Sequence, residues 1–131
     1  MKKYLLDTDI CIYFLKGLYD IDKKINSAGF ENISISEITV AELKYGVENS
    51  SNKVKNRKVI NQFIDSISIL PIINCLDYYA SEKVRLRKSG LPIDDFDLLI
   101  GCTAVSNNMT LVTRNIRHLN RIKNISIENW V

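Results

Sequence analysis

Short apolar runs alternate along the chain with longer segments in which apolar residues recur every three or four positions. The short runs are typical of strands buried on both faces of a parallel sheet, and the longer segments of amphipathic helices. We predict strands at residues 3–6, 32–36, 68–73, 110–113 and 124–128, and helices around 10–15, 19–28, 40–47, 59–67, 76–88 and 96–103. This alternation with short links favours an α/β fold of three layers, α/β/α, around a mainly parallel sheet.

The length of 131 residues suits one domain, so we expect the whole chain, 1–131, to form a single domain. Its 46% hydrophobic and 25% charged residues are typical of a globular protein. No apolar run approaches the ~20 residues that cross a bilayer. Asp7 and Asp9 also interrupt the apolar stretch near the N-terminus, which makes it a poor signal peptide. We therefore expect a cytoplasmic protein with no membrane partner.

The net charge of +3 does not by itself indicate a nucleic-acid partner, because solvated surface lysines give the same value. The distribution of charge is more informative than its sum. Residues 98–127 contain no acid, and basic residues also cluster at 53–58 and 83–88. Each basic cluster is either a solvated helix face or part of a surface that binds nucleic acid.

Acidic side chains are found where strands are predicted to end and where helices are predicted to begin. In open α/β sheets the functional crevice lies beyond the carboxyl ends of the strands. The side chains expected near that edge are Asp7 and Asp9 after the first strand, Glu42 early in the helix after the second, Asp94, Asp95 and Asp97 at the opening of a late helix, and Asn115 just after the strand at residues 110–113.

Carboxylates that converge repel one another unless a cation is present. Mg²⁺ or Mn²⁺ prefers oxygen ligands, can organise phosphates and can activate a water molecule, so an acidic pocket with basic surroundings suits phosphodiester hydrolysis. Structural roles are the alternative: Asp9 and Asp95 are natural helix N-caps, Asp94 suits a solvated turn, and Asp97 suits the positive end of a helix dipole. Asp7 is harder to explain in this way, because a carboxylate that ends a buried strand needs a partner.

Other chemistries lack the residues that they need. The chain has no glycine-rich phosphate-binding motif and no G-x-S-x-G motif. Its one histidine, His118, rules out an H-E-x-x-H zinc site, and we predict that it is a surface group. Cys11, Cys75 and Cys102 have no spacing typical of a disulfide framework or a zinc site, so we predict three buried thiols.

Three blocks of this sequence resemble the PIN-domain ribonucleases and, among them, the VapC toxins of bacterial toxin–antitoxin pairs. The blocks are YLLDTDICIYFLKG, ISISEITVAELKYGVENS and GLPIDDFDLLIGCTAVSNNMTLVTRNIRHLNRIKNISIENW, in the order of the family. The resemblance implies that Asp7, Glu42 and Asp97 bind the metal. It places Asn115 at a fourth site position, which is Asp or Asn in the family. Because an amide carries no charge, we expect a single ion.

The resemblance further implies an Mg²⁺- or Mn²⁺-dependent endoribonuclease that cuts structured RNA, tRNA in many relatives. It also implies a homodimer that is held inactive, in a higher assembly, by a VapB-like antitoxin whose C-terminal segment lies across the active site. We favour Arg114 and Arg117 as contacts to RNA phosphates because they flank Asn115. Gly101 stands where the family often has Ala, and we expect it to loosen its helix by up to ~1 kcal/mol.

Two other functions compete with this interpretation. The first is a haloacid-dehalogenase-like phosphatase, in which Asp7 and Asp9 act as nucleophile and acid, and Asp94–Asp95 supply the late acidic pair. That late pair should follow a strand, whereas here it follows Gly90-Leu91-Pro92. The second is a non-catalytic RNA- or partner-binding PIN module. Such a module is expected to lack one of the metal-binding acids, whereas this sequence has Asp7, Glu42 and Asp97.

Overall fold

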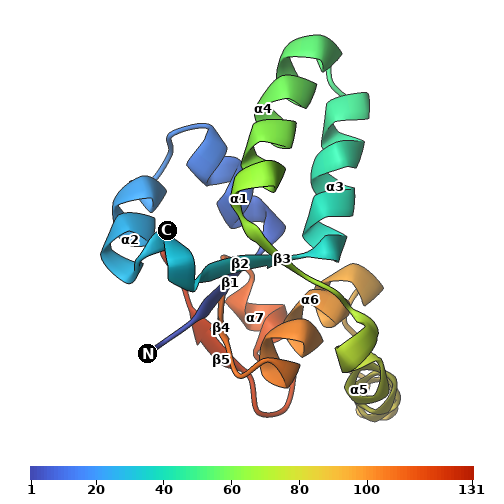
Figure 1. Ribbon diagram of the computed structural model, residues 1–131. Helices are drawn as coiled ribbons and strands as arrows, with labels where there is room; N and C mark the ends of the chain where they lie inside the picture. The colour runs from blue at the N-terminus through green and yellow to red at the C-terminus, as the bar shows by residue number, and fades with distance from the viewer.

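The computed structural model describes residues 1–131 and is built around a parallel sheet of five strands (Figure 1). The strands lie in the order β3–β2–β1–β4–β5, with β1 (Tyr4–Leu6) at the centre. The others are β2 (Ile33–Ser36), β3 (Ser68–Leu70), β4 (Thr110–Val112) and β5 (Ser126–Glu128). In the register, Leu5 of β1 pairs with Ser34 of β2 and Leu111 of β4.

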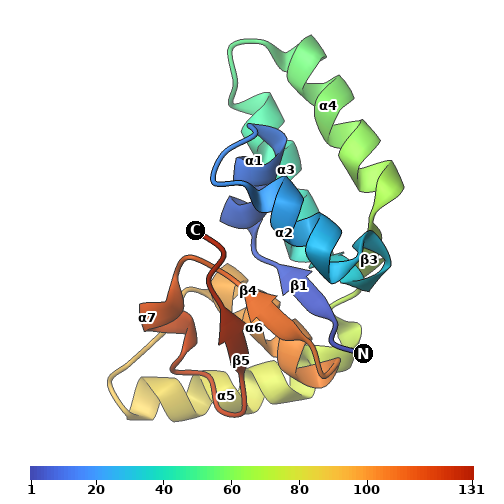
Figure 2. The ribbon, with the colours of Figure 1, turned by 90° about the vertical axis from the view of Figure 1, so that its left-hand side faces the viewer.

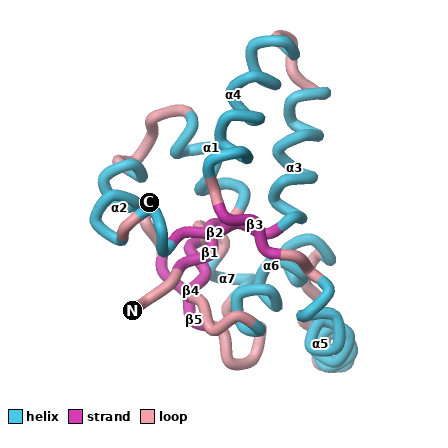
Figure 3. Tube along the Cα trace, viewed as in Figure 1, coloured by secondary structure: helices cyan, strands magenta, loops and turns pink.

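Helices cover both faces of the sheet, which confirms the predicted three-layer fold (Figures 1 and 3). One face is covered by α1 (Thr8–Leu15), α2 (Ile21–Ala28), α3 (Glu37–Glu48) and α4 (Lys53–Ser66). The other is covered by α5 (Leu76–Lys88), α6 (Asp95–Ser106) and α7 (Ile116–Leu119). Short 3₁₀ helices lie at η1 (Phe30–Asn32) and η2 (Ile73–Cys75). No helix is both long and apolar enough to span a bilayer.

The two hydrophobic cores meet at the central strands. Leu5 and Leu111 pack into the core under α5 and α6, whereas Leu6 and Val112 pack into the core under α1 to α4. All four side chains are completely buried. Successive residues of a strand point to opposite faces, so a strand covered on both faces reads as one continuous apolar run. The pair α3–α4 extends away from the sheet, on the side opposite to α5 (Figure 2).

Several predicted boundaries differ from the structure: α4, for example, begins at Lys53 and not near residue 59, and α7 was not predicted. The helix predicted from residue 19 begins at Ile21, because Tyr19 and Asp20 have left-handed backbones with φ of 58° and 54°. The third strand ends at Leu70, and the chain then turns into η2. Residue 32 belongs to η1 and not to β2. The three cysteines are buried free thiols, as predicted.

Gly101 has a packing role that differs from the expected loosening of its helix. A Cβ atom at this position would lie 2.3 Å from Cδ1 of Ile122 and 3.4 Å from side-chain atoms of Leu119 and Ile125. Gly101 therefore lets α6 approach the segment that follows α7 more closely than alanine would allow. The expected loosening of the helix stays a prediction, and the close packing is a second effect that opposes replacement by alanine.

We expect Gly101→Ala to destabilise the protein by about 1 kcal/mol, because overpacking of ~1–3 kcal/mol exceeds the ~1 kcal/mol gained from replacing a helical glycine. Ile122→Val removes only the Cδ1 atom that would clash. On its own it should cost ~0.5–1.5 kcal/mol, but in the Gly101→Ala background it should restore stability. Urea unfolding of the four proteins measures this coupling. If the losses of unfolding free energy in the two single variants simply add in the double variant, the Cδ1 contact is not the cause of the destabilisation.

Candidate active site

Asp7 lies at the carboxyl end of β1 and is the N-cap of α1. Its side chain is only 6% exposed. Oδ1 accepts a hydrogen bond of 2.8 Å from the backbone N–H of Thr8, and Oδ2 accepts one of 2.7 Å from the Thr113 hydroxyl. Burial raises the pKa of Asp7, and these two hydrogen bonds oppose the increase. The carboxylate is thus fixed in orientation from two strand ends, β1 and β4.

Glu42 reaches the same edge of the sheet from the second turn of α3. Ser36 at the end of β2 starts that helix by accepting the N–H of Ile38 at 3.1 Å. Oε1 of Glu42 accepts a hydrogen bond of 2.6 Å from the Thr8 hydroxyl, which lies 3.1 Å from the hydroxyl of Thr39. Burial raises the pKa of Glu42. Thr8 therefore joins Asp7 and Glu42 through its backbone N–H and its hydroxyl.

Asp97 is in the first turn of α6 and is half-buried. Its pKa is raised to about 6, first by burial and then by the negative charges of Asp7, Asp94, Glu42 and Asp9. Repulsion on this scale requires that the acids lie near one another. Asp97 is therefore within electrostatic reach of Asp7 and Glu42, which Thr8 joins through its hydrogen bonds.

The acids that flank the site have other roles than those predicted. Asp94 is the N-cap of α6, through a 3.3 Å hydrogen bond from the N–H of Phe96, so the prediction that Asp95 is this cap was wrong. Asp95 instead accepts hydrogen bonds of 2.8 Å from Tyr79 and from Lys83, and the bond from Lys83 lowers its pKa. Asp9 was also wrongly predicted as a cap. It is exposed in the first turn of α1, which Asp7 caps.

Asn115 follows β4 and is connected to Asp7 through Thr113. The backbone N–H of Asn115 donates to the Thr113 hydroxyl oxygen at 3.0 Å, and that hydroxyl donates to Asp7. The amide Oδ1 of Asn115 lies 2.7 Å from Nδ1 of His118, a hydrogen bond within α7 and its N-cap. His118 is exposed, as predicted, but it also orients the Asn115 amide.

Sequence reasoning missed Thr8, Thr113 and His118. The only signal that could have found the two threonines is their position, next to Asp7 and at the end of the fourth predicted strand. His118 is one helical turn after Asn115, a spacing at which side chains meet. Without the fold, these positions do not predict which residues the three side chains contact.

The donor set suits a hard divalent cation. Asp7, Glu42 and Asp97 offer carboxylate oxygens, the ligands that Mg²⁺ and Mn²⁺ prefer. As the side chains stand, no three acidic, histidine or cysteine side chains converge closely enough to hold one ion directly. Mg²⁺ commonly binds only one or two carboxylates and keeps several waters. The residues therefore fit an ion that is held partly through water, and positive charge there would relieve the repulsion around Asp97.

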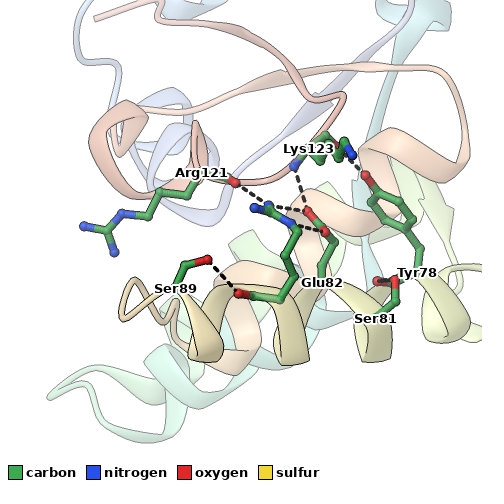
Figure 4. Close-up of polar contacts among 7 residues, drawn as sticks. Tyr78, Ser81, Glu82, Ser89, Arg121 and Lys123 are labelled. Atoms are coloured by element: carbon green, nitrogen blue, oxygen red, sulfur yellow. Dashed lines mark hydrogen bonds and ion pairs between the residues drawn. The ribbon is translucent and has the colours of Figure 1, made fainter.

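Several residues of the predicted basic clusters pair with acids, whereas others are exposed. Arg85 donates two hydrogen bonds to the buried Glu82 and one to the carbonyl oxygen of Arg121, so it ties α5 to the segment after α7 (Figure 4). Lys83 pairs with Asp95, as described above. In the cluster 53–58, Arg57 pairs with Glu48. Arg114 and Arg117, beside Asn115, are both exposed.

Comparisons with known proteins place the chain in a family. The family model described as PIN domain matches residues 4–125. Ribonuclease VapC2 of Rickettsia felis is 38% identical over 132 residues, which is 97% of each chain. The tRNA(fMet)-specific endonuclease VapC of Salmonella typhimurium is 30% identical over 131 residues, 99% of each chain.

A solved structure is also similar over nearly its whole length. VapBC2 from Rickettsia felis, bound to a DNA fragment from its promoter, superposes with a TM-score of 0.91 at 37% identity and covers 98% of both chains. The resemblance found in the sequence is thereby confirmed: the chain belongs to the PIN-domain family and, within it, to the VapC ribonucleases.

Proposed function

We propose that this chain is the toxin of a toxin–antitoxin pair and cleaves phosphodiester bonds in RNA with one Mg²⁺ or Mn²⁺ ion held by Asp7, Glu42 and Asp97, partly through water molecules. Dependence on a divalent metal is general among PIN-domain ribonucleases. The observation that carries the proposal is the bridge that Thr8 makes between Asp7 and Glu42 at one edge of the sheet, with the half-buried Asp97 within electrostatic reach of both. The match over residues 4–125 also supports a single PIN domain over the whole chain.

Residues around the site hold the acidic side chains in position and favour their charged forms. The hydrogen bonds from Thr8 and Thr113 hold Asp7 in one orientation and favour its charged form. Thr8 does the same for Glu42. When bound, a divalent cation neutralises phosphate charge and lowers the pKa of a water molecule. Asn115 adds no charge and its Oδ1 is engaged by His118, which favours one ion over two.

Arg114 and Arg117 complete the proposal as contacts to RNA phosphates. Both are exposed on either side of Asn115. Arginine is well suited to bind phosphate, because its planar guanidinium offers paired donors. Because one relative is named a tRNA(fMet)-specific endonuclease, we propose tRNA as the substrate class and the cytoplasm as the place of action.

The proposed partner is a VapB-like antitoxin, as in the solved VapBC2 structure, within an assembly based on a homodimer. A groove of about 340 Å³ runs between α1, α3 and α4 and reaches Glu42. Its apolar lining consists of Ile12, Leu15, Leu43, Val47, Val59 and Ile60. An antitoxin segment in this groove would end at the acidic site and block it.

The test is RNA cleavage by the chain purified free of antitoxin. We expect cleavage of bulk tRNA with Mg²⁺ or Mn²⁺, none with EDTA, and recovery when either metal is restored. A phosphatase would instead hydrolyse a small phosphate monoester in a reaction that depends on Asp7 and Asp9. The exposed position of Asp9 and the capping role of Asp94 give no support to that alternative. RNA binding without metal-dependent cleavage would identify the non-catalytic module.

Metal affinity should depend on pH through Asp97. With a pKa of about 6 in the metal-free protein, Asp97 is mostly protonated below that pH and must lose its proton to bind a cation. Affinity for Mn²⁺ should therefore rise by up to about tenfold per pH unit below pH 6 and level off above it. Calorimetric titration between pH 5 and 8 measures the profile. Asp97→Asn should weaken binding and flatten the profile, whereas equal wild-type affinity at pH 5 and 7 would contradict the assignment.

A further inference from the structure

Two tyrosines and an arginine form a cluster next to the acidic site. The ring centroids of Tyr13 and Tyr19 lie 4.9 Å apart at an interplanar angle of 75°. Nη1 of Arg114 donates a hydrogen bond of 2.7 Å to the Tyr13 hydroxyl, and its Cζ lies 5.9 Å from the centroid of the Tyr13 ring. The three side chains come from α1, from the loop after α1 and from the segment after β4. No other part of the proposed mechanism uses the two rings.

Arg114 links this cluster to the acidic site, because its neighbours in the sequence are residues of that site. Arg114 stands between Thr113, which donates to Asp7, and Asn115. Tyr13 forms an i, i+4 pair with Asp9 on α1, so these side chains share one face of that helix. A substrate phosphate at Asp7 and Asp97 would thus have the guanidinium of Arg114 and the two rings beside it.

The backbone holds Tyr19 in an unusual position. Tyr19 and Asp20 are consecutive non-glycine residues with positive φ, a conformation that L-amino acids rarely adopt. The loop is closed by a hydrogen bond of 2.8 Å from the N–H of Leu18 to the carbonyl oxygen of Tyr13. Nevertheless Tyr19 is 51% exposed, so burial of the ring does not explain this conformation. Strained backbone that presents an exposed side chain is typical of binding sites.

We infer that Tyr13, Tyr19 and Arg114 form a subsite for an unpaired nucleotide next to the bond that is cut. The base stacks on the exposed ring of Tyr19, and Arg114 binds the adjoining phosphate while the Tyr13 hydroxyl holds its guanidinium in place. Unpaired bases in RNA are recognised by stacking on aromatic rings and arginine planes. A paired base cannot offer a free face, so the subsite selects loops and single strands. The inference rests on the proposed ribonuclease function.

Binding in EDTA tests the subsite separately from cleavage. The probe is a short, unstructured, fluorescein-labelled RNA, and its anisotropy is measured against the full chain. We expect Tyr19→Leu to weaken binding about ten- to hundredfold, the range for losing a base-stacking contact. Tyr13→Phe, which keeps the ring and removes only the hydroxyl, should weaken it several-fold. The matched control is Tyr45→Leu on α3, where the tyrosine is 70% exposed, and it should bind like the wild type.

Three further measurements separate the possible outcomes. With Mg²⁺, both cluster variants should raise KM for RNA and leave kcat within about twofold, because the acids are untouched. Binding of a duplex of the same sequence should change much less than binding of the single strand. Wild-type affinity for the single strand in both Tyr19→Leu and Tyr13→Phe would overturn the inference, as would loss of antitoxin binding alone. If the wild-type chain binds RNA but does not cut it, the proposed function fails while the anisotropy still decides the subsite.

Discussion

Asp97→Asn is expected to reduce the rate of RNA cleavage by about 10²–10⁴-fold, the loss that follows from removing several kcal/mol of metal-assisted transition-state stabilisation. The variant should be at least as stable as the wild type at neutral pH without metal. Burial and the charges of Asp7, Asp94 and Glu42 disfavour the ionised form of Asp97, and asparagine removes that repulsion. Initial cleavage rates in Mg²⁺ and urea unfolding in EDTA measure the two effects. A loss of activity with a gain of stability identifies a functional charge.

Asp95→Asn is the matched control, because it makes the same chemical change in the first turn of the same helix. Asp95 is exposed and its carboxylate faces Lys83 and Tyr79 of α5. Its replacement should change stability little, as for other exposed ion pairs, and leave cleavage nearly unchanged. If Asp97→Asn cleaves as fast as Asp95→Asn, the site assignment is wrong.

The position of the site could be predicted from the sequence because it follows from the topology of a parallel sheet. Asp7 comes directly after an apolar run and Asn115 shortly after another, and these runs become the neighbouring central strands β1 and β4. Their carboxyl ends meet at one edge. Asp97 and Glu42 are on helices, where spacing alone gives several possible orientations. Their approach to Asp7 depends on how α3 and α6 pack, and only the resemblance selected them from the sequence.

Details within one turn of a helix could not be predicted. Asp94 and Asp95 have the same capping propensity, and the choice between them depends on Tyr79 and Lys83, which attract Asp95 toward α5. The start of α2 was misplaced for a similar reason. The composition of residues 19–28 suits a helix, but the left-handed backbone at Tyr19 comes from the closed loop that follows α1. A contact between α5 and α6 decides the first feature, and the closed loop between Tyr13 and Leu18 decides the second.

Glu82 was not singled out in the sequence, because one acid beside a basic cluster looks like part of a solvated helix face. In the structure it is 3% exposed and accepts three hydrogen bonds: 2.7 and 2.8 Å from Arg85, and 2.7 Å from the backbone N–H of Lys123 (Figure 4). Arg85 continues the network to the carbonyl oxygen of Arg121. The network fixes the segment after α7, which packs against Gly101 of α6.

Glu82→Ala is expected to destabilise the protein by about 3 kcal/mol, near the lower end for one partner of a buried ion pair, because Arg85 remains 40% exposed to solvent. The change leaves the N–H of Lys123 without its acceptor and the guanidinium without its counterion. Urea unfolding at neutral pH measures the loss. Glu48→Ala is the matched control: its carboxylate also pairs with an arginine but is 63% exposed, so its loss should change stability much less than the loss of Glu82. Equal losses in the two variants would contradict the role of burial.

The effect of pH separates the charge of Glu82 from its packing. Its pKa is lowered from 4.5, first by the hydrogen bonds from Arg85. A carboxyl group with a lowered pKa in the folded state contributes stability that is complete above the unfolded pKa and is lost as the pH falls through the folded pKa. The difference in unfolding free energy between the wild type and Glu82→Gln should therefore be largest near neutral pH and shrink below pH 4.5. If that difference is the same at pH 7 and at pH 3, the charge of Glu82 does not stabilise the fold, and the loss in Glu82→Ala comes from packing alone.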